Sequence, residues 1–193
     1  MISSISSIAM DLEFSGLHAD ATVISIALVS DCGKTFYAEF NDFDIEQTER
    51  MGCKEAVFSG LRYLGEKSCG MYENDFQDYY LKDNKEFIAK KMVEWFTQFE
   101  DVEIVGDVLA YDWVLFCDLL GGAFSIPKNV YYIPFDIANA FKIAGIDPDI
   151  SRVEYLGGIE SLGFEYKPHN ALTDAKVALF CYFKLMARLA VGK

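Results

Sequence analysis

The chain has 193 residues, of which 52% are hydrophobic and 15% aromatic, and its formal net charge at pH 7 is −13. This length and apolar content indicate a folded domain with a sizeable core and exclude a disordered chain. The acidic balance argues against a protein that binds long nucleic acids tightly and without sequence preference, since such proteins present a basic surface. It leaves open an enzyme that engages a few terminal nucleotides, because bound metal ions supply local positive charge.

The first three predicted elements are strands. Residues 5–14 alternate apolar and other side chains with the period of a strand, and a β-branched, apolar run predicts a second strand at 21–29. The turn signal Asp31-Cys-Gly33 separates this run from a third predicted strand at 34–40, so the second and third strands are expected to form a hairpin. Residues 41–83 are acidic and mixed; we expect a helix at 45–64 and a looping connection after it.

The rest of the chain alternates helices and strands. The predicted helices are residues 85–99, 111–120 and 136–144 and a long helix from about residue 170, and the predicted strands are 103–106 and 130–133. Asp136 is the expected N-cap of its helix. Three strands in a meander followed by alternating elements imply an α/β sandwich with a mixed sheet of roughly five strands, formed by residues 1–193 as one domain.

Compartment and membrane association follow from local composition. The five cysteines are scattered, their number is odd, and the N-terminus lacks the basic start and apolar run of a signal peptide. We therefore expect reduced thiols and a cytoplasmic protein. Residues 171–191 are strongly apolar, but charged side chains interrupt them, which argues against a membrane span. These side chains are Asp174, Lys176, Lys184 and Arg188.

The triplet Asp-x-Glu occurs three times, beginning at Asp11, Asp44 and Asp101. The first triplet alone stands at the C-terminal end of a predicted strand, where Phe-Ser-Gly breaks the pattern. Side chains two apart on a strand point to the same face, so Asp11 and Glu13 would present two carboxylates side by side. The other two triplets fall in polar stretches and are expected to be solvated. An exposed strand end is the alternative interpretation of the first triplet taken alone.

Two further acids and a histidine extend this pair. In the middle of the chain, both Asp107 and Asp112 are candidates for a third acid. Asp107 also fits a strand-end carboxylate in a loop, and Asp112 a first-turn acid that the helix dipole stabilises. His169 and Asp174 form the only His-x4-Asp match, at the start of the last predicted helix. Several acids together with a histidine can hold two divalent metal ions and a water-activating base, which is the equipment for cutting phosphodiester bonds.

In this order the fragments resemble the DEDDh 3′–5′ exonucleases, the proofreading-exonuclease-like branch of the ribonuclease H-like fold. The matching residues are Asp11-Leu-Glu13 on the first strand, Asp112 before an apolar helix, and His169 with Asp174 leading into the last helix. The stretch Ala110-Tyr-Asp-Trp-Val looks most like the RNase AS type of exoribonuclease, and residues 10–17 look like oligoribonuclease. The resemblance covers nearly the whole chain and implies a ribonuclease H-like three-layer sandwich.

The resemblance implies a two-metal exoribonuclease that removes nucleotides one at a time from RNA 3′ ends and works as a homodimer. It assigns four acids to the two ions, either Mg²⁺ or Mn²⁺, and these acids are Asp11, Glu13, Asp112 and Asp174. Oxygen ligands suit both ions, and two such ions can clamp the attacking and leaving oxygens of a phosphodiester. His169 would be the general base that deprotonates the attacking water. The alternative interpretation of His169 is a loop residue that packs near Pro168.

Phe14 and Leu17 border the predicted site in sequence. In the families that the chain resembles, an apolar residue at the position of Leu17 wedges against the last base, and such contacts tolerate any base. Phe14 stands where many relatives carry Thr, which would change how the terminal nucleotide is held. The alternative interpretation places both side chains in the core.

Other functions remain open at this stage. A DNA exonuclease of the same family is the first alternative, because no identified residue reads a 2′-hydroxyl. A noncatalytic, exonuclease-like interaction module is the second, although such a module is expected to lose a metal ligand and this chain keeps all the candidates. A metal-dependent phosphatase or sugar-nucleotide enzyme is the third, and it does not explain the His-x4-Asp spacing that ends in a helix.

Overall fold

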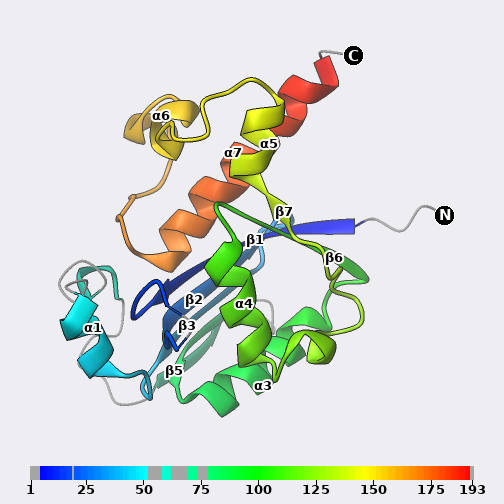
Figure 1. The fold of residues 1–193 in the computed structure, drawn as a ribbon. Coiled ribbons are helices and arrows are strands. Elements are labelled where there is room, and N and C mark those ends of the chain that lie inside the picture. Colours follow the sequence, from blue (N-terminus) through cyan, green and yellow to red (C-terminus); the bar gives the residue numbers. More distant parts are fainter. Residues whose placement is uncertain (1–4, 19, 52–57, 62–68, 74–77, 192–193) are drawn as a thin grey trace.

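A mixed sheet runs through the middle of the protein (Figure 1). The computed structural model describes residues 5–18, 20–51, 58–61, 69–73 and 78–191. The strands are β1 (Ile5–Phe14), β2 (Val23–Ser30), β3 (Thr35–Phe40), β4 (Cys69–Glu73), β5 (Asp78–Asp83), β6 (Asp101–Gly106) and β7 (Phe135–Asp136). Within these described residues the sheet has seven strands in the order β4-β5-β3-β2-β1-β6-β7. Strands β1, β2 and β3 pair antiparallel, whereas β6 pairs with β1, and β5 with β3, in parallel.

Helices cover both faces of the sheet. The main helices are α1 (Ile45–Met51), α3 (Lys85–Phe96), α4 (Ala110–Leu119), α5 (Ile137–Ile143), α6 (Arg152–Leu156) and α7 (Ala171–Val191). Figure 1 shows α3 and α4 on one face and α5 and α7 on the other. Helix α6 packs against α7 rather than against the sheet. The result is a three-layer α/β sandwich, as the element order predicted.

The alternation along β1 decides which helix layer each of its side chains meets. Ile8 and Met10 are buried in the core under α3 and α4, whereas Ala9 belongs to the core under α5 and α7. Since successive side chains of a strand point to opposite faces, Asp11 and Glu13 share the face of Ala9. The two acids therefore point toward the layer that contains α7.

Most predicted elements correspond to elements of the structure. The hairpin of β2 and β3 is confirmed, as are the first strand, β6 and the helices near residues 85, 111, 137 and 171. The N-cap role of Asp136 is confirmed as well, because its Oδ1 accepts a hydrogen bond from the backbone N–H of Asn139 at 2.8 Å.

The number and place of the strands differ from the prediction. Residues 69–83 hold β4 and β5 where a looping connection was expected, and the strand expected at 130–133 is absent from the described structure. Val130 alone bridges to Val102, and the strand next to β6 is β7. Residues 131–133 are aromatic or apolar, so their sequence resembles that of a buried strand, but their side chains are exposed in the structure. Of the helix expected at 45–64, α1 is described, and residues 52–57 and 62–64 lie outside the described part.

Two expectations about composition can be compared with the described residues. Cys32, Cys117 and Cys181 are free thiols. No helix in the described part of the chain has both the length and the apolar character needed to cross a membrane.

Candidate active site

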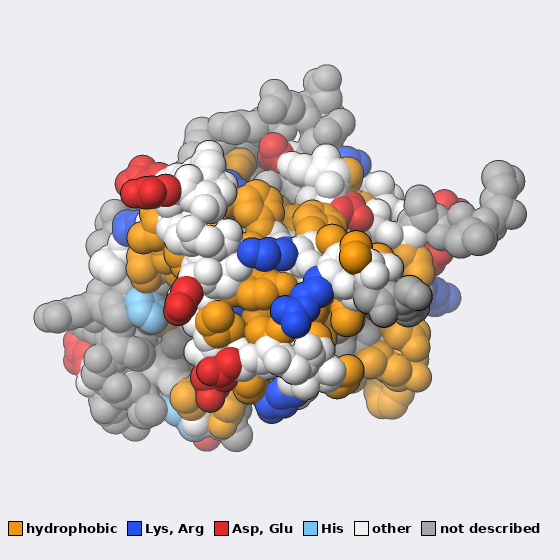
Figure 2. All heavy atoms as spheres, turned by 90° about the horizontal axis from the view of Figure 1, so that it is seen from above, with side chains coloured by type: hydrophobic (Ala, Val, Ile, Leu, Met, Phe, Trp, Pro, Cys, Tyr) orange, Lys and Arg blue, Asp and Glu red, His pale blue; other side chains and the backbone are white. Residues whose placement is uncertain are grey.

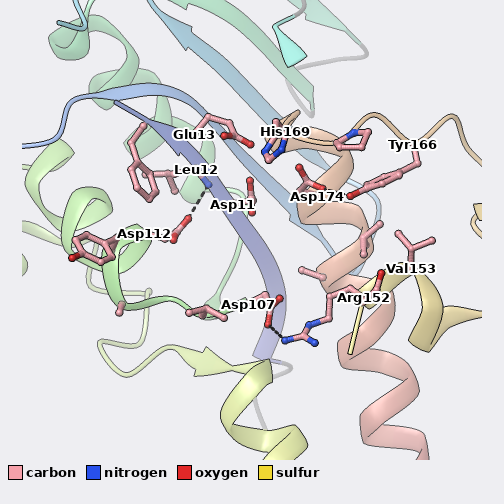
Figure 3. A pocket seen from close by; sticks show the side chains of 18 of the residues that line it. Asp11, Leu12, Glu13, Asp107, Asp112, Arg152, Val153, Tyr166, His169 and Asp174 are labelled. Carbon is pink, nitrogen blue, oxygen red and sulfur yellow. Dashed lines mark hydrogen bonds and ion pairs between the residues drawn. The ribbon is translucent and has the colours of Figure 1, made fainter. Parts of the chain in front are cut away.

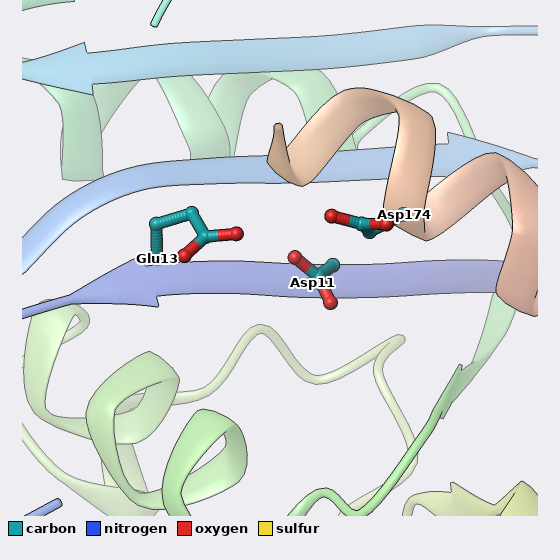
Figure 4. Close-up of side chains that lie close together, drawn as sticks. All are labelled: Asp11, Glu13 and Asp174. Atoms are coloured by element: carbon teal, nitrogen blue, oxygen red, sulfur yellow. The ribbon is translucent and has the colours of Figure 1, made fainter. Parts of the chain in front are cut away.

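Three carboxylates from β1 and α7 lie side by side (Figure 4). Asp11 and Glu13 extend from β1, and Asp174 extends from the first turn of α7. Each offers one oxygen, and these three oxygens lie within 4.8 Å of one another. All three residues are half-buried. Because the ligands are all carboxylate oxygens, the set fits a hard divalent cation such as Mg²⁺ or Mn²⁺.

The start of α7 is built so that Asp174 faces β1. Asn170 precedes the helix, and its Oδ1 accepts a hydrogen bond from the backbone N–H of Thr173 at 3.1 Å, which caps the helix N-terminus. The hydroxyl group of Tyr166 donates a hydrogen bond to Oδ1 of Asp174, with the two oxygens 2.9 Å apart. The cap sets where α7 begins, and the tyrosine fixes the rotamer of the acid at its first turn.

Asp112 approaches the same site from the opposite side of β1 (Figure 3). The pairing of β1 with β6 ends at Ala9, and beyond it the backbone N–H of Leu12 donates to Oδ1 of Asp112 at 3.0 Å. Among the described residues, the group of three mutually close acids does not include Asp112. Its second carboxylate oxygen is not used in the bond to Leu12.

His169 lies in the exposed loop that leads into α7, with a positive φ of 59°. A left-handed backbone is uncommon for a residue other than glycine, and such strain is often found at functional sites. The residue beside it is tied to a distant segment, because Nδ2 of Asn170 donates to the carbonyl oxygen of Gly60 at 2.5 Å. A Cβ atom at Gly60 would lie 1.8 Å from the carbonyl oxygen of His169, so only glycine fits there.

Burial, together with repulsion between neighbouring carboxylates, raises the pKa values of the acids at this site. Burial, followed by the charges of Asp174 and Asp112, raises the pKa of Glu13 to about 8. Burial and the charge of Asp174 also hold the pKa of Asp11 well above its usual range. Burial raises the pKa of Asp112 to about 6, although the hydrogen bond from Leu12 opposes the shift. Such mutual repulsion is what a bound cation relieves.

A cavity of about 620 Å³ opens over the acids. All seven side chains that the sequence nominated line it, together with several that it did not. The nominated residues are Asp11, Glu13, Phe14, Leu17, Asp112, His169 and Asp174. Phe14 is half-buried, whereas Leu17 is 65% exposed and free to meet a ligand.

Tyr111 is a cavity residue that the sequence analysis missed. Its ring stacks on Phe14 with centroids 6.1 Å apart, and its hydroxyl donates to the carbonyl oxygen of Leu17 at 3.4 Å. The signal was its place directly before Asp112, because consecutive residues in the first turn of α4 both reach the end of β1. The side chains of Phe14, Leu17 and Tyr111 form one border of the cavity.

Asp107 and Arg152 form an ion pair at another border of the cavity, with Nη2 2.7 Å from Oδ1 (Figure 3). The guanidinium also donates to the carbonyl oxygens of Ile150 and Pro148, so it joins the end of β6 to the segment before α6. Asp107 is therefore held by a cation, whereas Asp112 is held by a backbone N–H. Arg152 lies 45 residues from Asp107 in sequence, and nothing in the sequence pattern pairs them.

Comparisons with known proteins give a family and a fold for this chain. The family model described as the 3′–5′ exoribonuclease Rv2179c-like domain matches residues 6–182. No curated protein sequence matches the chain. Among solved structures, the Neurospora crassa Pan2 catalytic unit (protease and nuclease domain) is similar, with a TM-score of 0.50 and 17% sequence identity. That match covers 97% of this chain and 28% of the other, and it confirms the ribonuclease H-like α/β fold class.

Proposed function

The chain belongs to the Rv2179c-like 3′–5′ exoribonuclease domain family, and on this premise we propose that it is a metal-dependent enzyme that releases nucleoside monophosphates from the 3′ ends of single-stranded or short RNA. The observation that carries the proposal is the group formed by Asp11, Glu13 and Asp174 at the base of the cavity. Residues far apart in the sequence meet there, and their raised pKa values favour a bound cation.

The proposal assigns the metal ions to Asp11, Glu13, Asp174 and, through its second oxygen, Asp112. Divalent ions at this site would supply positive charge that stabilises the phosphodiester in the transition state. The RNase AS or oligoribonuclease subtype, the homodimer and the extent of the domain over residues 1–193 belong to the same proposal.

The chain's own residues have separate tasks in hydrolysis. A nitrogen of the His169 imidazole accepts the proton of the attacking water, whose oxygen bonds to phosphorus as the bond to the 3′ oxygen breaks. The released 3′ oxygen takes a proton from solvent. Phe14 and Leu17 hold the terminal nucleoside through apolar contacts that do not distinguish one base from another. Tyr166 keeps Asp174 oriented through its hydrogen bond.

Degradation of end-labelled RNA and DNA oligomers with Mg²⁺, Mn²⁺ or EDTA tests the function. A 5′-labelled RNA should shorten one nucleotide at a time with either ion and stay intact in EDTA. Faster shortening of DNA than of RNA would favour the DNA exonuclease. No cleavage of either polymer with either ion would favour the noncatalytic module.

The matched pair of variants for this assay is Glu13→Gln and Glu86→Gln. Both remove one carboxylate charge, but Glu86 is exposed on α3, on the far side of the sheet. Glu13→Gln should be inactive while Glu86→Gln keeps wild-type activity. Equal activity of the two variants would contradict the assignment of the site.

A further inference from the structure

The outward side of α7 carries a basic and aromatic stripe. Lys176, Phe180, Lys184 and Arg188 follow one another at intervals of four residues, which places them along one side of the helix. Phe180 is 39% exposed, and its neighbour Phe183 is 43% exposed. We call these five side chains the α7 stripe.

Among the described residues, no carboxylate forms an ion pair with a cation of the α7 stripe. Over the part of the chain that the structure describes, Lys82, Lys85, Lys91 and Arg152 form ion pairs with acids, whereas no stripe cation does. Instead, Nζ of Lys176 lies 5.4 Å from the ring centre of Phe164, and Nζ of Lys184 lies 4.9 Å from the ring centre of Tyr155. Nζ of Lys184 also donates to the carbonyl oxygen of Tyr155 at 2.6 Å. The stripe therefore keeps its positive charge in a chain whose net charge is −13.

Aromatic rings accompany the cations along the same surface. Figure 2, a view from the side on which α5, α6 and α7 lie, shows Lys and Arg side chains at the centre of this face among hydrophobic ones. The ring of Phe180 packs edge-on against Phe164 with centroids 5.8 Å apart and stays partly exposed. A positively charged surface interleaved with exposed aromatic rings is what single-stranded nucleic acid requires, since its backbone needs cations and its bases need stacking partners.

The α7 stripe lies on the helix whose first turn enters the candidate active site. The helix that carries it also carries Asp174, the only acid in residues 171–191. With a rise of about 1.5 Å per residue, Lys184 lies about 15 Å and Arg188 about 21 Å along the axis from Asp174. At about 100° per residue, Lys176 projects from the side of the helix away from Asp174, whereas Lys184 and Arg188 turn back toward the side of Asp174. A strand whose 3′ end occupies the cavity and that runs along α7 therefore meets Lys184 and Arg188 within a few nucleotides.

We propose that the α7 stripe binds the part of a single-stranded RNA that lies 5′ of the nucleotide being removed. This inference rests on the proposed function and names its substrate more closely: RNA long enough to leave the cavity. The net charge of −13 opposes the binding of polyanions in general, so a locally basic surface is needed to hold the RNA backbone.

A second copy of the chain fits this surface less well. Twofold pairing presents the same patch on both subunits, so the cations of one stripe would face those of the other. Like charges brought together at an interface oppose association. An anionic membrane is the remaining alternative, because basic and aromatic side chains on one helix also suit a lipid surface.

The test compares a dinucleotide with a single-stranded RNA of roughly 12 nucleotides, a length within the site sizes of single-strand binders. In the triple variant Lys176→Gln, Lys184→Gln, Arg188→Gln, we expect hydrolysis of the dinucleotide to be unchanged. For the longer RNA, KM should rise roughly tenfold at low salt, and the slope of log affinity against log salt should fall by about 2, or about 0.7 per lost phosphate contact. Phe183→Ala should weaken binding of the longer RNA alone, by about fivefold or more.

The control removes the same number of charges elsewhere. The variant Lys34→Gln, Lys90→Gln, Lys128→Gln changes the turn after β2, helix α3 and the loop before β7, all away from α7. It should behave like the wild type with both RNAs. Equal effects of the two triple variants, or an effect of the stripe variant on the dinucleotide as well, would overturn the proposal.

Two further measurements separate the alternatives. Fluorescence anisotropy of the labelled longer RNA in EDTA reports binding without turnover, so the stripe is tested even if the wild type cleaves nothing and the proposed function fails. Vesicles of phosphatidylcholine with phosphatidylserine provide the lipid arm. Stripe-dependent binding to these vesicles with no stripe-dependent binding to RNA would assign the surface to membranes and refute the RNA path.

Discussion

At the scale of single residues, Glu13 links the site to the pH dependence of stability. Its pKa rises from 4.5 to about 8 on folding, so between these pH values the folded protein holds more protons than the unfolded chain. The free energy of unfolding of the metal-free protein should therefore fall as pH rises through this window. Thermal unfolding in EDTA should show a smaller fall for Glu13→Gln than for the wild type.

A bound cation should remove this penalty. Mg²⁺ or Mn²⁺ that binds the folded state alone raises the unfolding temperature, most strongly near pH 8 where the acids repel one another. Asp11→Asn should unfold at a higher temperature than the wild type in EDTA, gain little from Mg²⁺ and lack nuclease activity. A wild type with equal stability in Mg²⁺ and EDTA at pH 8 would contradict the metal assignment.

His169 should matter for turnover more than for substrate binding. As general base, it should contribute about 10²–10⁴ to kcat, the usual effect of a positioned acid–base group. We expect His169→Ala to lose that factor in kcat with little change in KM, measured on a short RNA with saturating Mg²⁺. Wild-type turnover by this variant from about pH 6 to 9 would make His169 a structural residue.

Asp112 and Asp107 should differ in their effect on activity. Asp112 is hydrogen-bonded to β1 beside the acid cluster through Oδ1, whereas Asp107 is paired with Arg152. Asp112→Ala should be inactive and Asp107→Ala at least partly active in the same RNA assay. The opposite result would move the third acid by five residues and refute the alignment with the DEDDh pattern.

At the scale of elements, the loop before α7 depends on a segment from the middle of the chain. Gly60 contacts the backbone of His169 so closely that an added Cβ would overlap its carbonyl oxygen. Gly60→Ala must displace one of the two segments, at a cost of about 1–3 kcal/mol in the free energy of unfolding. Denaturant unfolding would measure this cost, and kcat should fall with it because the histidine moves.

The matched substitution for this prediction is Ala89→Gly on α3, which changes one methyl group in the opposite direction and far from the loop. It should lower the free energy of unfolding by about 0.5–1 kcal/mol without reducing kcat per folded molecule. A Gly60→Ala variant with wild-type stability and turnover would contradict this prediction, because the loop before α7 would then accommodate the added methyl group without displacing His169.

At the scale of the whole molecule, the proposed homodimer is expected to form through a surface other than the α7 stripe. Residues 171–191 are strongly apolar, and the structure leaves Phe180 and Phe183 of this helix partly exposed. We expect light scattering at micromolar concentration to give twice the mass of one chain. The stripe cations would repel one another across a twofold axis, so the stripe is not expected to lie in the dimer interface. The stripe variant should therefore have the same mass as the wild type. A monomeric wild type would reject the homodimer.

The sequence by itself determined the elements whose pattern is local. The alternation along residues 5–14 was sufficient to place Asp11 and Glu13 on one face, and the spacing from His169 to Asp174 was sufficient to put both at the start of the last helix. These patterns depend on the fixed periods of strands and helices, so they survive without any knowledge of the fold. The nominated residues line one cavity because the fold brings the end of β1 together with the starts of α4 and α7.

Tertiary structure alone decided the contacts between distant segments. The pairing of Arg152 with Asp107, the bond from Tyr166 to Asp174 and the fit of Gly60 under His169 have no sequence period. Strands β4 and β5 were missed for the same reason, since short strands are stabilised by neighbours distant in sequence and by burial rather than by their own propensity. The α7 stripe lies between these cases: its spacing is visible in the sequence, but its exposure and its unpaired charges depend on how the layers pack.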